Sequence, residues 1–228
     1  MTADGIDIWY GDAVDEAQHY QRYWKILDAV ERANSAKFIN PLLQKRYVLI
    51  HGRLRILLAE YAQRAPENLV IRRSEYGKPF LAEHPALAFN LSHTGGSFVI
   101  AVALDCRLGV DLEFCKPRAD LPGLVERIFT EEEAGYWQQL PEGRKMQEFY
   151  RFWTRKEAFV KAVGRGLALG LKQCAINITN PSEFVRIPAE FGPASLWRVN
   201  DVDLGPDFCC AFVADKNFSV VRLRNFSD

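Results

Sequence analysis

Two carboxylates stand two positions apart in an apolar stretch of the chain, in the triplet Asp111-Leu112-Glu113. If this stretch forms a strand, the alternation of side chains places both carboxylates on one face and Leu112 on the other. A hard divalent cation such as Mg²⁺ suits this arrangement, because it binds one or two carboxylates together with waters and substrate phosphate oxygens. The alternative is a strand end whose two charges lie in solvent, and the triplet alone does not decide between them.

A third carboxylate interrupts the apolar face of a predicted helix. Glu157 lies four residues after Trp153 and three before Val160, which are positions that one helix face shares. Lys161 follows one turn later, so an exposed Glu–Lys pair of small stabilising effect is one explanation. That explanation fits an apolar face poorly, because burying a carboxylate without a partner costs free energy. The position therefore indicates a metal ligand, a general base, or both.

Groups that could bind an anion precede the carboxylates in the chain. The segment 89–96, F-N-L-S-H-T-G-G, is predicted to be a polar turn before a strand, and such a turn can direct N–H groups and hydroxyls at an anion. Lys78 adds a cation, whereas His93 on its own is more typical of a structural or surface histidine. Arginines of a predicted helix suit phosphate because each can donate two parallel hydrogen bonds, although helix arginines are commonly just solvated. These arginines are Arg46, Arg53 and Arg55.

The elements that must position these residues mix helices with strands, which favours an α+β fold over a doubly wound sheet. Apolar residues at three-to-four spacing predict helices, and Thr130 with Glu133 forms a capping box at the start of one of them. The predicted helices cover residues 15–28, 42–62, 130–140 and 144–163. Compact β-branched runs predict strands at 98–104 and 110–114, joined as a hairpin. Short strands are expected after the glycine cluster at 164–170.

One run of the sequence recurs in the second half of the chain. F-V-I-A-V-A-L-D at 98–105 is similar to F-C-C-A-F-V-A-D at 208–215, 110 positions later, and at the same offset Val110 falls on Val220. Two related units, each about half of the chain, would explain this, although short apolar hairpins also match by chance. The second copy reads V-V-R-L where the first has V-D-L-E, so a two-unit molecule would have one acidic site.

Composition and charge exclude several classes of protein. The chain has 228 residues, 48% of them hydrophobic and 25% charged, which is typical of a globular protein with one large domain or two small ones. Its 29 basic residues balance 29 acidic ones, which argues against an overall basic nucleic-acid binder. Basic residues are nevertheless concentrated in segments 31–80 and 144–172, each with a net charge of +6, and this suits a polyphosphate ligand and an acidic protein partner.

Neither a membrane segment nor a disulfide framework is expected. The longest apolar runs fall far short of the ~20 residues that a spanning helix needs, and the first residues lack the basic and apolar regions of a secretory signal. Five cysteines without C-x-x-C spacing support neither a zinc site nor paired disulfides. We therefore expect a reduced, cytoplasmic protein that binds neither membrane nor nucleic acid.

Four motifs follow one another in the chain: Y-G-K-P (76–79), F-N-L-S-H-T-G (89–95), G-V-D-L-E (109–113) and F-W-T-R-K-E-A-F-V-K-A-V-G-R-G-L (152–167). Together they resemble those of the 4′-phosphopantetheinyl transferases, specifically the long, surfactin-type members, over about residues 46–170. The resemblance implies two similar α+β halves fused as a pseudo-dimer, which fits the sequence repeat. We expect the halves to be residues 1–106 and 107–228, with the metal site in the second, and we expect the fused molecule to be a monomer.

The resemblance also implies the reaction and the residues that carry it. The protein would transfer the 4′-phosphopantetheine group from coenzyme A to a serine of an apo acyl carrier protein or peptidyl carrier protein, releasing adenosine 3′,5′-bisphosphate. Asp111, Glu113 and Glu157 match the family's Mg²⁺ ligands. Glu157 and Lys161 would be catalytic, the first taking the serine proton directly or through water and the second stabilising charge on the pyrophosphate. The residues matched to coenzyme A binding are Arg46, Lys78, Pro79, Ser92, His93 and Lys161.

One segment departs from the family's pattern. Some long members carry several lysines before the helix of Arg46, where they hold the 3′-phosphate of coenzyme A. This chain reads E-R-A-N-S-A-K at 31–37, which leaves Arg32 and Lys37 as the cations of that segment. Its contacts to the 3′-phosphate are therefore open.

Two other classes of function would use the same residues. A metal-dependent phosphohydrolase could apply the three carboxylates to a nucleotide or to coenzyme A, and it would release product without a protein acceptor. A non-catalytic module could bind coenzyme A or a nucleotide and turn nothing over. The sequence ranks both below the transferase, because neither accounts for the four motifs together.

Overall fold

The computed structural model describes residues 2, 4–13 and 19–226. Its strands are β1 (Gly5–Asp12), β2 (Ile71–Arg73), β3 (Pro79–Leu81), β4 (Leu87–Thr94), β5 (Ser97–Leu104), β6 (Leu108–Phe114), β7 (Ala175–Ile176), β8 (Phe184–Arg186), β9 (Arg198–Asp201), β10 (Phe208–Ala214) and β11 (Val220–Asn225). Its helices are α1 (Tyr20–Ile26), α2 (Ala29–Ala36), α3 (Pro41–Ala62), α4 (Leu121–Ile128), α5 (Glu131–Gln138) and α6 (Glu142–Ala162). The predicted α+β class is confirmed.

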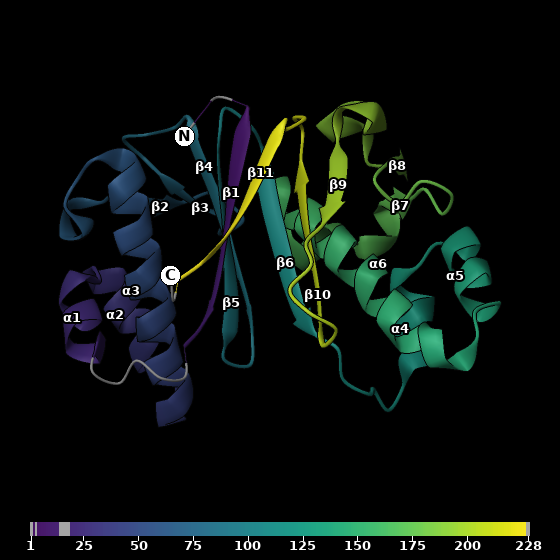
Figure 1. Ribbon diagram of the computed structural model, residues 1–228, viewed down its shortest axis with the longest axis horizontal. Coiled ribbons are helices and arrows are strands. Elements are labelled where there is room, and N and C mark those ends of the chain that lie inside the picture. The colour runs from purple at the N-terminus through teal and green to yellow at the C-terminus, as the bar shows by residue number, and fades with distance from the viewer. Residues whose placement is uncertain (1, 3, 14–18, 227–228) are drawn as a thin grey trace.

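Two sheets stand next to each other at the centre of the molecule, with a long helix on the outer side of each (Figure 1). The first sheet has the strand order β11-β1-β5-β4, and the second has the order β6-β10-β9. Helix α3 covers the first sheet and α6 covers the second. The shorter helices lie further out, α1 and α2 beside α3, and α4 and α5 beside α6.

Strand β5 is buried on both faces, which explains its unbroken apolar sequence. Phe98, Ile100 and Val102 pack with α3, whereas Val99 and Ala101 lie between the two sheets. The cluster between the sheets also takes in side chains of β1, β6 and β10: Ile6, Ile8, Leu108, Val110, Leu112 and Phe212. This shared core fixes the position of β6 relative to the first sheet.

The hairpin predicted from residues 98–104 and 110–114 is wrong, although both strands exist as β5 and β6. Strand β5 pairs with β1 on one edge and with β4 on the other, whereas β6 pairs with β10 in the second sheet. Because both edges of β5 are occupied, β6 cannot pair with it as a hairpin. Its apolar face packs against the sheet instead.

The two segments of the sequence repeat take corresponding positions in the two sheets. Strands β5 and β10 are inner strands, and the strand that follows each of them lies in the opposite sheet. Strand β6 pairs with β10, and β11 pairs in parallel with β1. The last strand of the chain, β11, therefore completes the first sheet, whereas β6 forms an edge of the second (Figure 1).

The helices predicted at 42–62, 130–140 and 144–163 are confirmed as α3, α5 and α6, with ends that differ by a few residues. The predicted capping box at the start of α5 is present. The helix predicted at 15–28 corresponds in part to α1, since residues 14–18 lie outside the described ranges and Asp28 instead caps α2. Helices α2 and α4 and strand β1 were not predicted, because each is only eight residues long, although Leu121, Leu124, Val125 and Ile128 of α4 do follow a three-to-four spacing.

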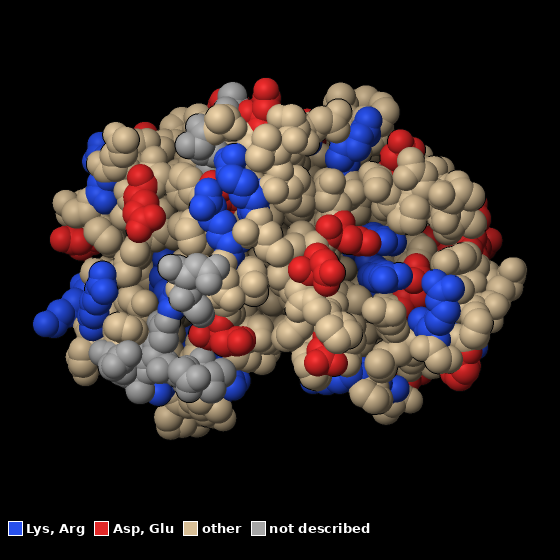
Figure 2. All heavy atoms as spheres, in the orientation of Figure 1, with Lys and Arg blue, Asp and Glu red and all other residues tan. Residues whose placement is uncertain are grey.

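Charged side chains of both signs are interspersed on the face that Figure 2 shows. Several cations of the two positive segments are engaged in ion pairs, which reduces the basic surface that the sequence predicts. These pairs join Arg55 to Asp28 and Glu31, Arg155 to Asp201, and Lys156 to Glu133. Within residues 4–13 and 19–226, no helix is long and apolar enough to cross a membrane.

Gly109→Ala is expected to destabilise the protein, because α6 crosses β6 at this glycine. A Cβ atom at Gly109 would lie 2.0 Å from the carbonyl oxygen of Ala158 and 2.4 Å from the backbone nitrogen of Ala162. Overpacking typically costs about 1–3 kcal/mol, and more where backbone must move. Urea denaturation should show this loss, whereas Gly135→Ala, in open space on α5, should be neutral or slightly stabilising. Equal midpoints for the wild type and Gly109→Ala would contradict the close contact.

Candidate functional site

Strand β6 and helix α6 bring the three predicted carboxylates to one place. Asp111 and Glu113 lie on the same face of β6 as Gly109, which is the face that contacts α6. From α6, Lys161 Nζ donates a hydrogen bond to Asp111 Oδ1 at 2.7 Å. Glu157 lies one turn before Lys161 and is 8% exposed. The carboxylate that interrupts the apolar face of α6 therefore faces the carboxylates of β6.

Polar side chains of β4 bind the backbone of β6 along its free edge. The segment predicted as a polar turn at 89–96 is in fact strand β4 up to Thr94, and the turn is limited to the two glycines that follow. Side chains of alternate residues of β4 point toward β6 and accept hydrogen bonds from its N–H groups. The three bonds are Val110 N to Asn90 Oδ1 at 2.8 Å, Leu112 N to Ser92 Oγ at 3.2 Å, and Phe114 N to Thr94 Oγ1 at 3.4 Å.

Ser92, Asp111 and Lys161 form a closed set of hydrogen bonds. Lys161 Nζ donates to Ser92 Oγ at 2.8 Å, and Ser92 Oγ donates to Asp111 Oδ1 at 2.9 Å. The other oxygen, Asp111 Oδ2, is buried and has no hydrogen-bond partner in the described part of the chain. A buried carboxylate oxygen without a partner is costly, so its position favours a cationic ligand.

Burial and the charges of neighbouring carboxylates raise the pKa values of Glu157 and Glu113. Burial, followed by the negative charges of Asp111 and Glu113, raises the pKa of Glu157 to about 7. Burial and the charge of Asp111 also raise the pKa of Glu113. The nearby ammonium of Lys161 acts in the opposite direction on both. Glu157 is therefore a carboxyl group that can accept a proton near neutral pH.

The carboxylates of Asp111, Glu113 and Glu157 are suitable ligands for a hard cation, but they do not surround a metal position on their own. Among the side chains that the structure describes, no three from His, Cys, Asp and Glu are gathered closely enough to enclose a metal ion. Mg²⁺ does not require such an enclosure, because proteins commonly hold it through one or two carboxylates while phosphates and waters complete the octahedron. The unpartnered Asp111 Oδ2 and the raised pKa values of Glu113 and Glu157 fit a cation in this place.

A groove begins beside this cluster on the other face of β4. A cavity of about 590 Å³ has Pro79, Leu91 and His93 in its wall, and a smaller one of about 50 Å³ has Arg46 and His93. The predicted coenzyme-binding residues are thus divided by position. Arg46, Pro79 and His93 line the groove, while Ser92 and Lys161 lie at the carboxylates. Burial of the ring, then the positive charges of His51 and Lys161, lower the pKa of His93.

Lys78 connects the C-terminal end of α6 to the start of β6. Its Nζ donates to Ala162 O at 2.6 Å and to Leu108 O at 2.9 Å. Burial lowers the pKa of Lys78 to about 8. Two of its three N–H donors are therefore occupied by backbone carbonyls, so any contact with phosphate would use the third or require these bonds to open.

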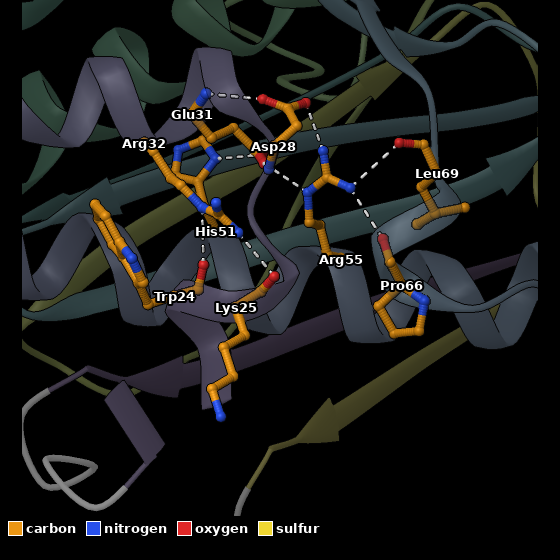
Figure 3. Close-up of polar contacts among 9 residues, drawn as sticks. All are labelled: Trp24, Lys25, Asp28, Glu31, Arg32, His51, Arg55, Pro66 and Leu69. Carbon is orange, nitrogen blue, oxygen red and sulfur yellow. Dashed lines mark hydrogen bonds and ion pairs between the residues drawn. The ribbon is translucent and has the colours of Figure 1, made fainter. Parts of the chain in front are cut away.

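The other two arginines of α3 have structural contacts. Arg55 is fully buried in ion pairs with Asp28 and Glu31 (Figure 3), so its interpretation as a phosphate ligand is wrong. Arg53 lies over the ring of Phe226 at 4.8 Å. Of the predicted arginine set, Arg46 is the one whose side chain lines the groove.

Four residues that shape the site were not identified from the sequence. Asn90 and Thr94 accept hydrogen bonds from the backbone of β6, and Gly109 allows α6 to pack closely against β6. His51 lies in the wall of both cavities. The alternation of small polar residues at 90, 92 and 94 was a signal for a strand with one polar face. The sequence gives no comparable signal for His51, because its role depends on which helix face meets the groove.

Comparison with known proteins identifies the family. A family model described as 4′-phosphopantetheinyl transferase superfamily matches residues 107–213, and one described as 4′-phosphopantetheinyl transferase, N-terminal, matches residues 15–105. The 4′-phosphopantetheinyl transferase HetI of Nostoc sp. is 32% identical over 222 residues, which is 96% of this chain and 90% of that protein. The 4′-phosphopantetheinyl transferase Sfp of Bacillus subtilis is 24% identical over 197 residues, 86% of each chain. The resemblance carried by the motifs is thereby confirmed, and the chain belongs to the 4′-phosphopantetheinyl transferase superfamily.

Proposed function

We propose that the protein transfers the 4′-phosphopantetheine group of coenzyme A to a serine of an apo acyl carrier protein or peptidyl carrier protein. The observation that carries this proposal is the pairing of two features on opposite faces of β4. One is a buried acidic cluster with an unpartnered oxygen at Asp111, and the other is a groove lined by Arg46 and His93. Such a pair suits a ligand that carries both a pyrophosphate and a nucleotide. Membership of the family supports the same reaction.

Glu157 is the general base in this proposal. As a carboxylate beside Asp111 and Lys161, it can take the proton of the acceptor serine directly or through one water. The serine oxygen then forms a bond to the β-phosphorus of coenzyme A. The bond from that phosphorus to the bridging oxygen breaks, and adenosine 3′,5′-bisphosphate leaves.

Lys161 stabilises charge on the pyrophosphate. Its ammonium lies between Ser92 Oγ at 2.8 Å and Asp111 Oδ1 at 2.7 Å, which positions it before the substrate arrives. A preorganised cation is more effective than one that must be reoriented as the reaction proceeds. Ser92 in turn orients both Lys161 and Asp111, so it acts on the reaction through them.

We propose Mg²⁺ as the metal of the site, held by Asp111, Glu113 and Glu157. A bound Mg²⁺ neutralises pyrophosphate oxygens and the charge that develops on the leaving group. The unpartnered Asp111 Oδ2 and the mutual repulsion of the three carboxylates support this assignment. Coenzyme A would in addition contact Arg46, Lys78, Pro79 and His93.

We propose that the chain consists of two halves, residues 1–106 and 107–228, and that the metal ligands lie in the second half. Support comes from the family models, one of which ends at residue 105 and the other of which begins at 107, and from the second sheet, whose strands β6, β10 and β9 all follow residue 107. A fused pair of halves has both parts of its site in one chain. We therefore propose that the protein acts as a monomer.

The transfer is tested by the intact mass of a carrier protein. The protein, coenzyme A and Mg²⁺ are incubated with several apo acyl and peptidyl carrier proteins, each beside a variant whose acceptor serine is alanine. The expected result is a gain of one phosphopantetheine group on the serine form alone. If no carrier gains mass while coenzyme A is broken down without a carrier, the protein is a phosphohydrolase. If coenzyme A binds and stays intact throughout, the protein is a binding module.

A further inference from the structure

Two cysteine side chains meet at the end of β6, beside the acidic cluster. Cys115, which follows β6, and Cys209, on β10, are 94 positions apart in the sequence, yet their Sγ atoms are 3.3 Å apart. Both are free thiols in this structure. The pairing of β6 with β10 explains the contact, because it places Cys209 opposite Glu113. Cys115 follows Glu113 by two positions and therefore lies on the same face.

The neighbouring cysteine of β10 points the other way. Cys209 and Cys210 are adjacent in the strand, so their side chains lie on opposite faces. Cys209 belongs to the core that packs with α6, whereas Cys210 belongs to the core between the two sheets. Of these two cysteines, Cys209 is therefore the one that faces Cys115.

The pair is accessible to small molecules. Cys115 is partly exposed, and Cys209 is 5% exposed. A further cavity, also of about 590 Å³, has Cys209 in its wall together with Gln147 of α6 and Phe208 of β10. The thiol of Cys115 donates to Cys209 Sγ, and the thiol of Cys209 lies 3.7 Å from Gln147 O. A small oxidant can therefore reach both sulfurs from solvent.

A disulfide would require a small movement of these sulfurs and of the strand ends that carry them. An S–S bond is about 2.05 Å long, so the two Sγ atoms must approach each other by roughly 1.3 Å. Side-chain rotation supplies part of this approach, and the ends of β6 and β10 supply the rest. Glu113 lies opposite Cys209 and two residues before Cys115. Its carboxylate therefore moves when these strand ends move.

We propose that Cys115 and Cys209 form a reversible disulfide, which slows the transfer reaction by displacing Glu113. This proposal rests on the proposed transfer reaction, in which Glu113 is a ligand of Mg²⁺. Because Mg²⁺ requires nearly ideal octahedral geometry, a displaced ligand weakens its binding. The two cysteines are positioning residues, since they act on the reaction through Glu113.

Glutathione disulfide, as a small disulfide, can serve as the oxidant. Cys115, the more exposed of the pair, loses its proton and attacks one sulfur of glutathione disulfide, which releases one glutathione. Cys209 then loses its proton and attacks the Cys115 sulfur of the mixed disulfide, which releases the second glutathione. Two protein thiols are thereby oxidised to one disulfide, and one glutathione disulfide is reduced to two glutathione molecules, which take up the two protons.

The first test asks whether the bond forms. Wild type treated with glutathione disulfide should lose two hydrogen atoms in intact mass and two of its five reactive thiols. Trypsin leaves Cys115 in peptide 108–118 and both cysteines of β10 in peptide 199–216, so these two peptides should be joined. Cys210→Ala is the matched control and should still form the bond, whereas Cys209→Ala should not.

The second test asks whether the bond acts on the metal site. Transfer by the oxidised and reduced forms is measured over a range of Mg²⁺ concentrations. Oxidation should lower kcat by about 10–100-fold at low Mg²⁺, since a displacement of 1 Å can cost 10²-fold, and should raise the Mg²⁺ concentration for half-maximal rate. Dithiothreitol should reverse both effects. Cys115→Ser and Cys209→Ala should transfer at near the wild-type rate and should not respond to the oxidant.

Oxidation should also raise the urea midpoint of wild type, whether or not transfer occurs. The bond joins residues 94 positions apart, so it restricts the unfolded chain. If wild type transfers to no carrier protein, the transfer proposal fails on its own. The effect on the site is then measured by adding Mg²⁺ during urea denaturation, which should raise the midpoint of the reduced form more than that of the oxidised form.

Three results would overturn the proposal. The first is that peptides 108–118 and 199–216 are not joined after oxidation. The second is an equal loss of thiols in Cys209→Ala, which would mean that another pair of cysteines had reacted. The third is that the oxidised and reduced forms respond equally to Mg²⁺, in transfer or in urea denaturation, which would mean that the bond leaves Glu113 in place.

Discussion

Glu157→Gln is expected to reduce transfer to a carrier protein by about 10²–10⁴-fold, the range that a general base contributes. Glutamine has nearly the same shape as glutamate, but it cannot take the serine proton and it is a weak ligand for Mg²⁺. Intact-mass kinetics on a carrier protein measures the loss. Glu142→Gln is the matched control, because Glu142 lies on the same helix in an exposed pair with Lys145. Near-normal turnover in Glu157→Gln would remove Glu157 from the mechanism.

The same substitution is expected to stabilise the metal-free protein at alkaline pH. Folding raises the pKa of Glu157 from 4.5 to about 7, chiefly by burial and then by the charges of Asp111 and Glu113. Between these two pH values the folded protein holds a proton that the unfolded chain has lost. The free energy of unfolding therefore falls as pH rises through this window, and the full penalty of the charged Glu157 is present above pH 7.

Glutamine carries no charge, so its variant lacks this penalty. Urea denaturation in EDTA should show the variant more stable than wild type by up to about 3 kcal/mol at pH 8, since each pKa unit is worth about 1.4 kcal/mol. At pH 4.5 the difference should be largely gone. A variant that is less stable than wild type at pH 8 would mean that Glu157 is held by favourable contacts rather than strained by its neighbours.

The sequence predicted the long helices and the acidic cluster because both depend on local spacing. Apolar residues every three or four positions mark the buried face of α3 and α6, and Glu157 stands out because it breaks that pattern. The alternation in Asp111-Leu112-Glu113 likewise survives any choice of strand partner. These inferences needed only that a helix or strand form, not where it lies.

Strand pairing could not be predicted in the same way. Whether β6 continues the sheet after β5 depends on which edges of β5 are free, and one of them is taken by β1 from the first residues of the chain. Strand β11, from the last residues, then pairs with β1. The polar face of β4 was interpreted as a turn because its hydrogen-bond partners lie on β6, in the other sheet. The place of β6, the pairing of β11 and the strand conformation of β4 therefore all depend on contacts between segments that are distant in the sequence.

Two adjacent residues of α6 have different roles: Lys156 stabilises the fold, whereas Glu157 belongs to the proposed reaction site. The substitution Lys156→Met tests the first role. Lys156 is fully buried, and its Nζ donates to Glu133 Oε2 at 2.6 Å and to the carbonyl oxygens of Ile128 and Leu171. Glu133 is also fully buried, and its second oxygen accepts from Ile176 N at 2.7 Å. The pair therefore joins α6 to the end of α4, the start of α5 and the segment before β7.

Methionine in place of Lys156 fills a similar volume but leaves Glu133 as an uncompensated buried charge. Breaking a buried pair in this way typically costs about 3–5 kcal/mol, which for a chain of this size lowers Tm by roughly 10 °C. Thermal and urea unfolding should show the loss. Lys145→Met, which breaks the exposed pair with Glu142 on the same helix, is the matched control and should cost less than about 1 kcal/mol.

The double variant Lys156→Met/Glu133→Gln separates charge from packing. If the cost arises from the unpaired carboxylate, removing that charge should restore a large part of the lost stability, because a buried ion pair replaced as a whole is often neutral. If the cost arises from lost packing and lost bonds to carbonyl oxygens, the double variant should be no more stable than Lys156→Met. Well below its unfolding temperature, Lys156→Met should still transfer at near the wild-type rate, since Lys156 lies on the buried side of α6 and Glu157 at the carboxylates. A large loss of kcat in the folded variant would place Lys156 in the reaction.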